Sequence, residues 1–242
     1  MEIIKIEETD STNNWLAANE QDIPSTALVY CRCQSAGRGQ RGNSWESEPG
    51  KNITASLLFY PEDFPASLQF AISEAIALAI VGFLSDMGVE ARIKWPNDIY
   101  VGDKKICGIL IEHVVEGKNV TRTIAGFGIN LNQTHFLSDA PNPVSLRQLT
   151  DREYSIEESM ERLAAILEIT IEQLRKDPGA FHELFLKRLW RYDGCFHLFR
   201  DVKTKEEFKA LIKKVDRDGI LSLQTRQGHE RRYFFKEVEH IL

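Results

Sequence analysis

The stretch KWPNDIYVGDKKICGILIE, residues 94–112, alternates charged or amide side chains with short apolar runs. Pro96 cannot donate to a strand ladder, so it separates a strand that ends near Lys94 from one that begins at Asp98. The side-chain oxygens of Asn97 and Asp98 are hard ligands that suit Mg²⁺ bridging the phosphates of a nucleotide. An ordinary Pro-Asn-Asp turn would use the same residues, so this stretch alone leaves both interpretations open.

The strand that follows begins with a lysine and contains a glycine. Lysines are seldom buried unless they are paired, so Lys105 at the head of an apolar run with Gly108 suggests an anionic ligand. A lysine that simply reaches solvent is the alternative. The next apolar run contains Gly126 and Gly128, and glycines inside a strand often mark the close approach of a ligand or another backbone. A strand bulge would explain these two glycines equally well.

Upstream, residues 34–51 are rich in Gly, Arg, Ser and Asn without periodicity and predict a long loop. The run GRGQRG at residues 37–42 satisfies G-x-G-x-x-G, but a dinucleotide-binding turn must open a helix, and this loop leads into a strand. Arg38 and Arg41 could compensate the charge of a carboxylate or phosphate, and Trp45 offers a flat apolar surface. The alternative is a solvated surface loop, although long loops are often functional.

Hydrophobic periodicity divides the chain into a larger part with helices and strands and a smaller all-β part. Residues 66–87 are apolar almost all round, which predicts a buried helix. Ser155 begins a capping-box pattern that predicts a second long helix. After Gly194 the pattern changes to short alternating runs separated by two hairpin turns. We therefore predict a domain of residues 1–192 and a small domain of residues 193–242.

Composition narrows the class of protein. The chain has 242 residues and a net charge of −6, and an acidic balance argues against binding a nucleic-acid backbone. Its four cysteines lack the spacing of a zinc site and indicate a reduced, cytosolic chain. The start shows no signal-peptide pattern, and the longest apolar run, Ala75 to Leu84, is shorter than the roughly 20 residues that span a bilayer. We expect a cytoplasmic protein without membrane or nucleic-acid partners.

The order of the motifs along the chain is more specific than any motif alone. In this order they resemble the biotin–protein ligases, strongly over about residues 3–150 and weakly beyond. The resemblance implies an α+β fold: a mixed-sheet catalytic domain like class II aminoacyl-tRNA synthetases and lipoate ligases, plus a small C-terminal Src-homology-type β-barrel. The chain begins at the catalytic strand and so resembles the class without an N-terminal DNA-binding domain. The motifs are Ser11-Thr12-Asn13, residues 34–39, residues 94–98, Lys105 with residues 108–112, and residues 126–130.

The resemblance also implies an activity. Members activate biotin with ATP and Mg²⁺ to biotinyl-5′-AMP and transfer biotin to a lysine of a carrier, here the biotin carboxyl carrier domain of a carboxylase such as acetyl-CoA carboxylase. Two alternatives stay open: a lipoate–protein ligase-like enzyme, whose arginine-pair and triple-glycine signature is not found, and a biotin-binding regulator without catalysis. The oligomeric state, monomer or homodimer, is not decided by the sequence.

Carried over residue by residue, the resemblance assigns roles to the motifs. The expected catalytic residues are Lys105, Arg38 and Asp98, and Asp98 is also the expected Mg²⁺ ligand. The expected adenylate-binding residues are Arg38, Gln40, Arg41, Lys94, Asn97 and Asn130. The expected biotin-binding residues are Ser11, Thr12, Asn13, Gln34, Gly37, Arg38, Trp45, Lys105 and Gly108.

One position departs from the family pattern. The family loop usually reads Gly-Arg-Gly-Arg, and Gln40 stands where the second arginine would be. Arg41 is adjacent and could substitute for it. We expect the glutamine to loosen retention of the adenylate without abolishing catalysis.

Overall fold

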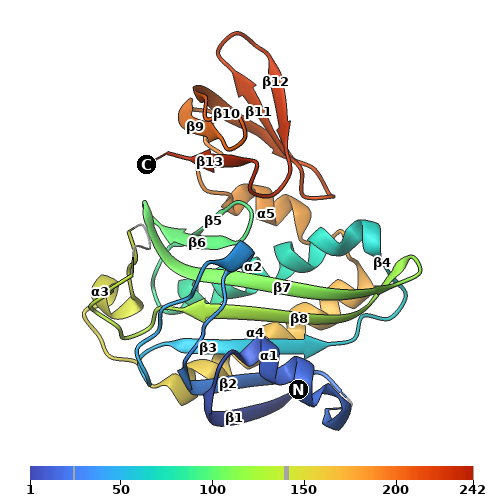
Figure 1. The fold of residues 1–242 in the computed structure, drawn as a ribbon, viewed down its shortest axis with the longest axis vertical. Coiled ribbons are helices and arrows are strands. Elements are labelled where there is room, and N and C mark those ends of the chain that lie inside the picture. Colours follow the sequence, from blue (N-terminus) through green and yellow to red (C-terminus); the bar gives the residue numbers. More distant parts are fainter. Residues whose placement is uncertain (24, 139–141, 242) are drawn as a thin grey trace.

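The computed structural model describes residues 1–23, 25–138 and 142–241, without the side chain of Arg41. Its larger part is built on an eight-stranded sheet of order β1-β2-β3-β8-β7-β6-β5, with β4 paired to β8 (Figure 1). Strands β1 and β2 run parallel and the other pairs antiparallel, so the sheet is mixed, as predicted. The strands are β1 (Glu2–Thr9), β2 (Ala27–Gln34), β3 (Ile53–Phe59), β4 (Phe64–Pro65), β5 (Arg92–Lys94), β6 (Asp98–Val101), β7 (Lys104–Glu116) and β8 (Asn119–Ile129).

Helices cover the two faces of this sheet unequally. The long helices α2 (Gln69–Asp86) and α4 (Ile156–Lys176) pack together on one face, and α1 (Thr12–Asn19) lies on the other (Figure 1). Alternation along β2 separates the two cores, because Leu28 faces α2 and α4 while Val29 joins the cluster under α1. Two short helices, α3 (Leu146–Thr150) and α5 (His182–Arg188), complete the helical set.

Helix α2 is the core helix that the sequence predicted. Residues 66–86 are the single stretch, among the described residues, that is long and apolar enough to cross a membrane. However, 72% of this window is buried inside the protein, against the sheet and α4. Its high hydropathy is therefore explained by burial within the fold.

The helix caps differ in part from the sequence-based expectation. Ser155 does cap α4 by accepting a hydrogen bond from the backbone nitrogen of Glu158, at 3.2 Å. The complete capping box, with both reciprocal hydrogen bonds, forms instead at α3 between Ser145 and Gln148. The predicted long loop before β3 also contains a short 3₁₀ helix at Gln40–Gly42. These differences are local and leave the predicted elements in place.

The smaller part is a five-stranded antiparallel sheet of order β12-β11-β10-β9-β13, which lies beyond α5 and β5 (Figure 1). Gly219 and Gly228, with φ of 86° and 85°, form the turns of the two predicted hairpins. Together with the mixed sheet and its helices, this small antiparallel sheet confirms the predicted α+β fold class. We propose the division into residues 1–192 and 193–242, which the change from α5 to strand supports. The strands are β9 (His197–Asp201), β10 (Glu207–Val215), β11 (Leu221–Thr225), β12 (Glu230–Tyr233) and β13 (Val238–His240).

The two parts meet at the turn between β5 and β6. The indole nitrogen of Trp95 donates a hydrogen bond to the backbone oxygen of Gly219, at 2.9 Å, in the hairpin between β10 and β11. Phe235 packs on Trp95 and on Phe70 of α2, with ring centroids 5.5 and 5.8 Å apart. The small sheet therefore supports the residue that directly precedes Pro96, at the start of the predicted phosphate turn.

Candidate functional site

Glycines leave bare backbone in the middle of the sheet, on the face that α1 covers. Gly108 of β7 lies opposite Gly128 of β8. A Cβ atom at Gly128 would overlap the indole ring of Trp45, and one at Gly126 would overlap the side-chain amide of Asn13. The glycines are thus required by side chains that lie directly on the strands. The close approach here is that of protein side chains, and the approach of a ligand stays a prediction. The register between β7 and β8 is regular at both positions, which speaks against a bulge there.

A buried polar network begins at the N-terminus of α1. Ser11, Thr12 and Asn13 are all less than 5% exposed. The backbone nitrogen of Thr12 donates to Gln34 Oε1 at 3.0 Å, and the Thr12 hydroxyl lies 2.6 Å from that of Ser56. Buried polar groups need such partners because leaving them unpaired costs free energy. The network therefore fixes the end of β2, the start of α1 and the middle of β3 relative to one another.

The network continues across the sheet to the glycine–arginine loop. The Ser56 hydroxyl donates to Asn13 Oδ1 at 2.6 Å, and Asn13 Nδ2 donates to Glu112 Oε2 at 2.7 Å. Arg38 then donates to Glu112 Oε1 at 2.8 Å and to Asn14 Oδ1 at 2.7 Å. The loop arginine is therefore tied both to α1 and to β7.

Trp45, from the glycine–arginine loop, lies directly on the glycine floor. Its ring contacts the backbone of Gly108 and Gly128, and Lys105 Nζ is 5.7 Å from the ring centroid. A backbone hydrogen bond from Trp45 to the oxygen of Gly37, at 2.8 Å, folds the loop back on itself. The indole Nε1 is buried and has no hydrogen-bond partner among the described residues, so a donor remains available at this position.

The other end of the site contains two lysines among groups of both signs of charge. Lys105 Nζ forms an ion pair with Asp98 Oδ1 at 2.7 Å. Burial lowers the pKa of Lys94, the positive charges of Lys105 and Arg191 lower it further, and the carboxylates of Asp98 and Glu239 oppose this. Two ammonium groups thus lie around Asp98, where an anionic ligand could interact with them.

Asn130 and Asn97 border this charged end. Asn130 Nδ2 donates to the backbone oxygen of Val144 at 3.1 Å, while its Oδ1 is buried and unpaired within the described part of the chain. The segment of Val144 also pairs with the backbone of Lys105, which places Asn130 beside that strand. Asn97 Nδ2 donates to the backbone oxygen of Ile109 at 2.6 Å, which leaves its Oδ1 available.

Two predicted residues lie apart from these contacts. Gln40, together with Asn97, lines a cavity of about 190 Å³ between β7, the start of α2 and the small sheet. The side chain of Arg41 lies outside the described residues. The roles of the other predicted site residues stay predictions.

A magnesium ion would find few ligands here. No group of three His, Cys, Asp or Glu side chains able to hold a metal forms in the part of the chain that the structure describes. Asp98 is the carboxylate at the charged end, and it is already paired with Lys105. Mg²⁺ is often held by one or two carboxylates, several waters and substrate phosphates, and such a metal fits Asp98.

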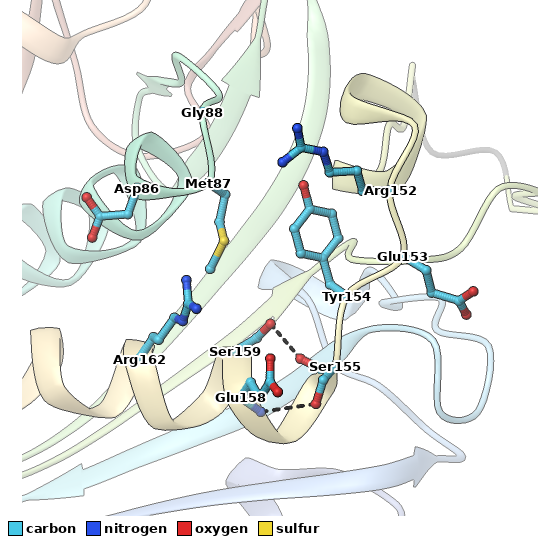
Figure 2. A pocket seen from close by; sticks show the side chains of 10 residues that line it. All are labelled: Asp86, Met87, Gly88, Arg152, Glu153, Tyr154, Ser155, Glu158, Ser159 and Arg162. Carbon is cyan, nitrogen blue, oxygen red and sulfur yellow. Dashed lines mark hydrogen bonds between the residues drawn. The ribbon is translucent and has the colours of Figure 1, made fainter.

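A larger cavity of about 400 Å³ lies between the end of α2 and the start of α4. Figure 2 shows Arg152 and Arg162 at its margins, with Tyr154 and Met87 between them. The hydrogen bonds drawn there belong to the Ser155 cap of α4 and hold no group for a ligand. None of the predicted site residues lines it.

Sequence reasoning missed two members of the site. Ser56 lies in the middle of a strand and is fully buried. Glu112 was part of a quoted motif but received no role. The sequence signal for both residues was weak. Ser56 is a polar residue within an apolar run, and Glu112 is a carboxylate at the end of another apolar run. Their importance depends on Asn13, which reaches both from another element.

Comparison with known sequences now defines the class of protein. The sequence model of the biotin/lipoate A/B protein ligase family matches residues 4–130, and the chain belongs to that family. The chain is 31% identical over 234 residues to the bifunctional ligase/repressor BirA of Bacillus spizizenii, covering 94% of this chain and 70% of the relative. It is 32% identical over 162 residues to the biotin–[acetyl-CoA-carboxylase] ligase of Paracoccus denitrificans, covering 64% and 67%.

The fold agrees with this assignment. A biotin protein ligase from Aquifex aeolicus, solved with biotin and ATP, superposes with a TM-score of 0.81 at 20% identity, covering 99% of this chain and 98% of that one. The Paracoccus and Aquifex proteins are named as biotin ligases, within a family whose description also includes lipoate ligases.

Proposed function

We propose that this chain is a biotin–protein ligase, which activates biotin with ATP and attaches it to a lysine of a carrier domain. The observation that carries the proposal is that the separated motifs contact one another across the sheet, with a hydrogen-bonded network at one end and Lys94, Asp98 and Lys105 at the other. Biotin has a polar ureido head, an apolar body and a carboxylate tail. A ligand of this kind needs a few fixed polar groups among apolar walls.

The neutral end suits the head and body of biotin. Gln34 accepts from Thr12 through its oxygen, so its amide nitrogen is available to donate to the ureido oxygen. The backbone at Gly108 and the hydroxyl of Ser11 provide further polar groups nearby. The ring of Trp45 and the bare strands beneath it form the apolar walls.

The charged end suits the first chemical step. The biotin carboxylate attacks the α-phosphate of ATP, which forms biotinyl-5′-AMP and releases pyrophosphate. Two anions must approach one another, and the cations of Lys105, Lys94 and Arg38 offset their repulsion. Mg²⁺, held by Asp98 and the phosphates, would further neutralise the charge. The unpaired oxygen of Asn130 would accept a hydrogen bond from the adenine amine.

In the second step the amine of the carrier lysine attacks the acyl carbon of the mixed anhydride, and AMP leaves. Loop 34–51 would cover the adenylate and exclude water during this interval. We propose a biotin carboxyl carrier domain as the partner, and acetyl-CoA carboxylase as its enzyme, which the name of the Paracoccus relative supports. A cytoplasmic location, a monomeric or homodimeric state and the absence of a nucleic-acid partner belong to the same proposal.

Mass spectrometry of a carrier domain tests the proposal directly. The purified chain is mixed with Mg²⁺-ATP, a biotin carrier domain and either biotin or lipoate. We expect a biotin-sized mass gain with biotin only. Replacing Lys105 by alanine should slow it by about 100-fold or more, because charge stabilisation of this kind has that order of effect. Lys104→Ala, at the exposed neighbouring position, is the matched control and should retain activity.

Two results would count against this function. A gain with lipoate instead of biotin would indicate a lipoate ligase, the other activity in the description of the family. Binding of biotin without release of pyrophosphate, with any carrier, would indicate a regulator without catalysis.

A further inference from the structure

Glu112 lies where the buried network meets the loop, and no step of the proposed reaction uses it. It projects from β7 on the same face of the sheet as Gly108. One of its oxygens accepts from Asn13 at 2.7 Å, and the other accepts from Arg38 at 2.8 Å. It is the point at which α1, the sheet and the glycine–arginine loop are joined.

The carboxylate of Glu112 fixes the direction of every hydrogen bond behind it. A carboxylate only accepts, so the amide nitrogen of Asn13 must face it. The amide oxygen of Asn13 then faces Ser56, which must donate. The hydroxyl of Thr12, 2.6 Å from that of Ser56, must donate in turn, because Ser56 has already used its only proton. All these donors point toward Glu112.

The fixed donor direction of this network extends to Thr12 and Gln34, which are proposed to bind biotin. With the hydroxyl of Thr12 turned toward Ser56, its lone pairs are free to accept from a ureido N–H. Gln34 keeps its oxygen on the backbone nitrogen of Thr12, so its amide nitrogen points away from the network. One acceptor and one donor are therefore presented in fixed positions. A urea group needs both.

We propose that Glu112 is a positioning residue for biotin: it sets the donor direction of the Thr12–Ser56–Asn13 network and holds Arg38 beside it. This inference rests on the proposed function. A glutamine at position 112 has the same shape but presents one donor and one acceptor. It cannot accept from Asn13 and from Arg38 with two oxygens, so either the network or the loop loses its fixed orientation.

Titration of the full chain tests this with Glu112→Gln and the control Glu116→Gln. Glu116 is exposed at the end of the same strand and points to the same face. We expect Glu112→Gln to raise the Kd for biotin about tenfold or more, because a hydrogen bond to a charged group contributes a free energy of that order. The Kd for ATP alone and the melting temperature should stay close to those of the native chain. Glu116→Gln should change none of these.

A double-mutant cycle with Ser56→Ala tests whether Glu112 affects biotin binding through the hydrogen-bond network or only at its own position. Glu112 and Ser56 both bond to Asn13, at its opposite ends. If Glu112 acts through the network, the two substitutions should be clearly less than additive in biotin affinity. Additive effects, an unchanged Kd for biotin in Glu112→Gln, or equal losses for biotin and ATP would each overturn the inference. If the native chain itself fails to bind biotin, the proposed function fails instead.

Discussion

The two ends of the candidate site are built on opposite principles. At the α1 end, Thr12, Ser56 and Asn13 bond to one another, and the network is complete without a ligand. At the other end, Lys94 and Lys105 lie around Asp98, and the oxygen of Asn130 has no partner among the described residues. The α1 end is therefore preorganised to bind a neutral group. The lysine end, by contrast, would be completed by a negatively charged ligand.

The largest expected effect comes from breaking the preorganised end with Gly126→Ala. The new methyl group would overlap the amide of Asn13 and displace it from Ser56 and Glu112. Over-packing costs about 1–3 kcal/mol, so we expect biotin affinity to fall by on the order of 10- to 100-fold. Isothermal titration would measure this. Gly82→Ala in α2, where nothing lies within 4 Å of the new atom, is the control. Unchanged affinity in Gly126→Ala would show that Asn13 adapts freely.

Lys94→Met removes charge from the other end. Burial lowers the pKa of Lys94, which means that its charged form is disfavoured in the folded chain. A methionine should raise the free energy of unfolding by about 0.5–2 kcal/mol and weaken ATP binding by about tenfold. Biotin affinity should not change. Denaturant unfolding and ATP titration would measure both, with exposed Lys118→Met as control. A destabilised variant would contradict the argument from burial.

His240, which lies next to Lys94, makes the stability of the small sheet depend on pH. Burial lowers the pKa of His240 to about 3, with help from Lys94, Arg191 and His197. The unfolded chain takes up this proton below its ordinary pKa near 6.5, and the folded chain does not. Stability is therefore lost as pH falls from about 6.5 toward 3, by at most about 1.4 kcal/mol per pH unit.

Replacing His240 by phenylalanine should remove this loss. Its ring lies between those of Trp190 and Phe199, with centroids 5.1 and 4.7 Å away, so an aromatic ring fits the position. We expect the decrease in stability between pH 7 and pH 5 to shrink by about 1–2 kcal/mol. Unfolding at both pH values would measure it, with exposed His229→Phe as control. Equal pH dependence in His240→Phe and the native chain would refute the assignment.

The smallest expected effect concerns Gln40. An arginine there would add a cation at the loop, and we expect release of biotinyl-5′-AMP to slow several-fold, as one exposed charge contact contributes up to about 1 kcal/mol. Release can be followed after a single turnover without carrier. Gln227→Arg in an exposed hairpin is the control. Unchanged release would show that the glutamine does not loosen the loop, and that Gln40 belongs only to its separate cavity.

Much of this arrangement was predictable because it depends on local sequence patterns. Alternating and apolar runs predicted β2, β7 and β8, and the run that is apolar all round predicted α2. The glycines within strands indicated the bare backbone of β7 and β8. Positive φ at Gly219 followed from its turn sequence. The lysine at the head of β7 was expected to have a partner because a buried charge requires one, and it pairs with Asp98, whereas its anionic ligand stays a prediction.

What escaped prediction depends on contacts between distant residues. The partnership of Ser56 with Asn13 joins positions 43 apart, and that of Asn13 with Glu112 joins positions 99 apart. Nothing in β3 itself distinguishes a functional serine from a tolerated one. The capping box at Ser145 was missed for another reason, since it follows a segment whose pattern predicts only irregular structure.

The hydrogen bond from Trp95 to Gly219 has a consequence for the time at which the enzyme becomes active in the cell. It joins residues 124 positions apart, so the ribosome delivers the β5–β6 turn long before the hairpin that supports it. The residues proposed to bind the head of biotin are all present once β8 has emerged, whereas the turn proposed to bind the phosphates must wait for the support of β10 and β11. We expect nascent chains arrested before β10 to bind biotin but to form no adenylate, and adenylate from such chains would show that the turn holds without the small sheet. Biotin capture would thus precede chemistry during synthesis, and a chain cut short would sequester the vitamin without using it.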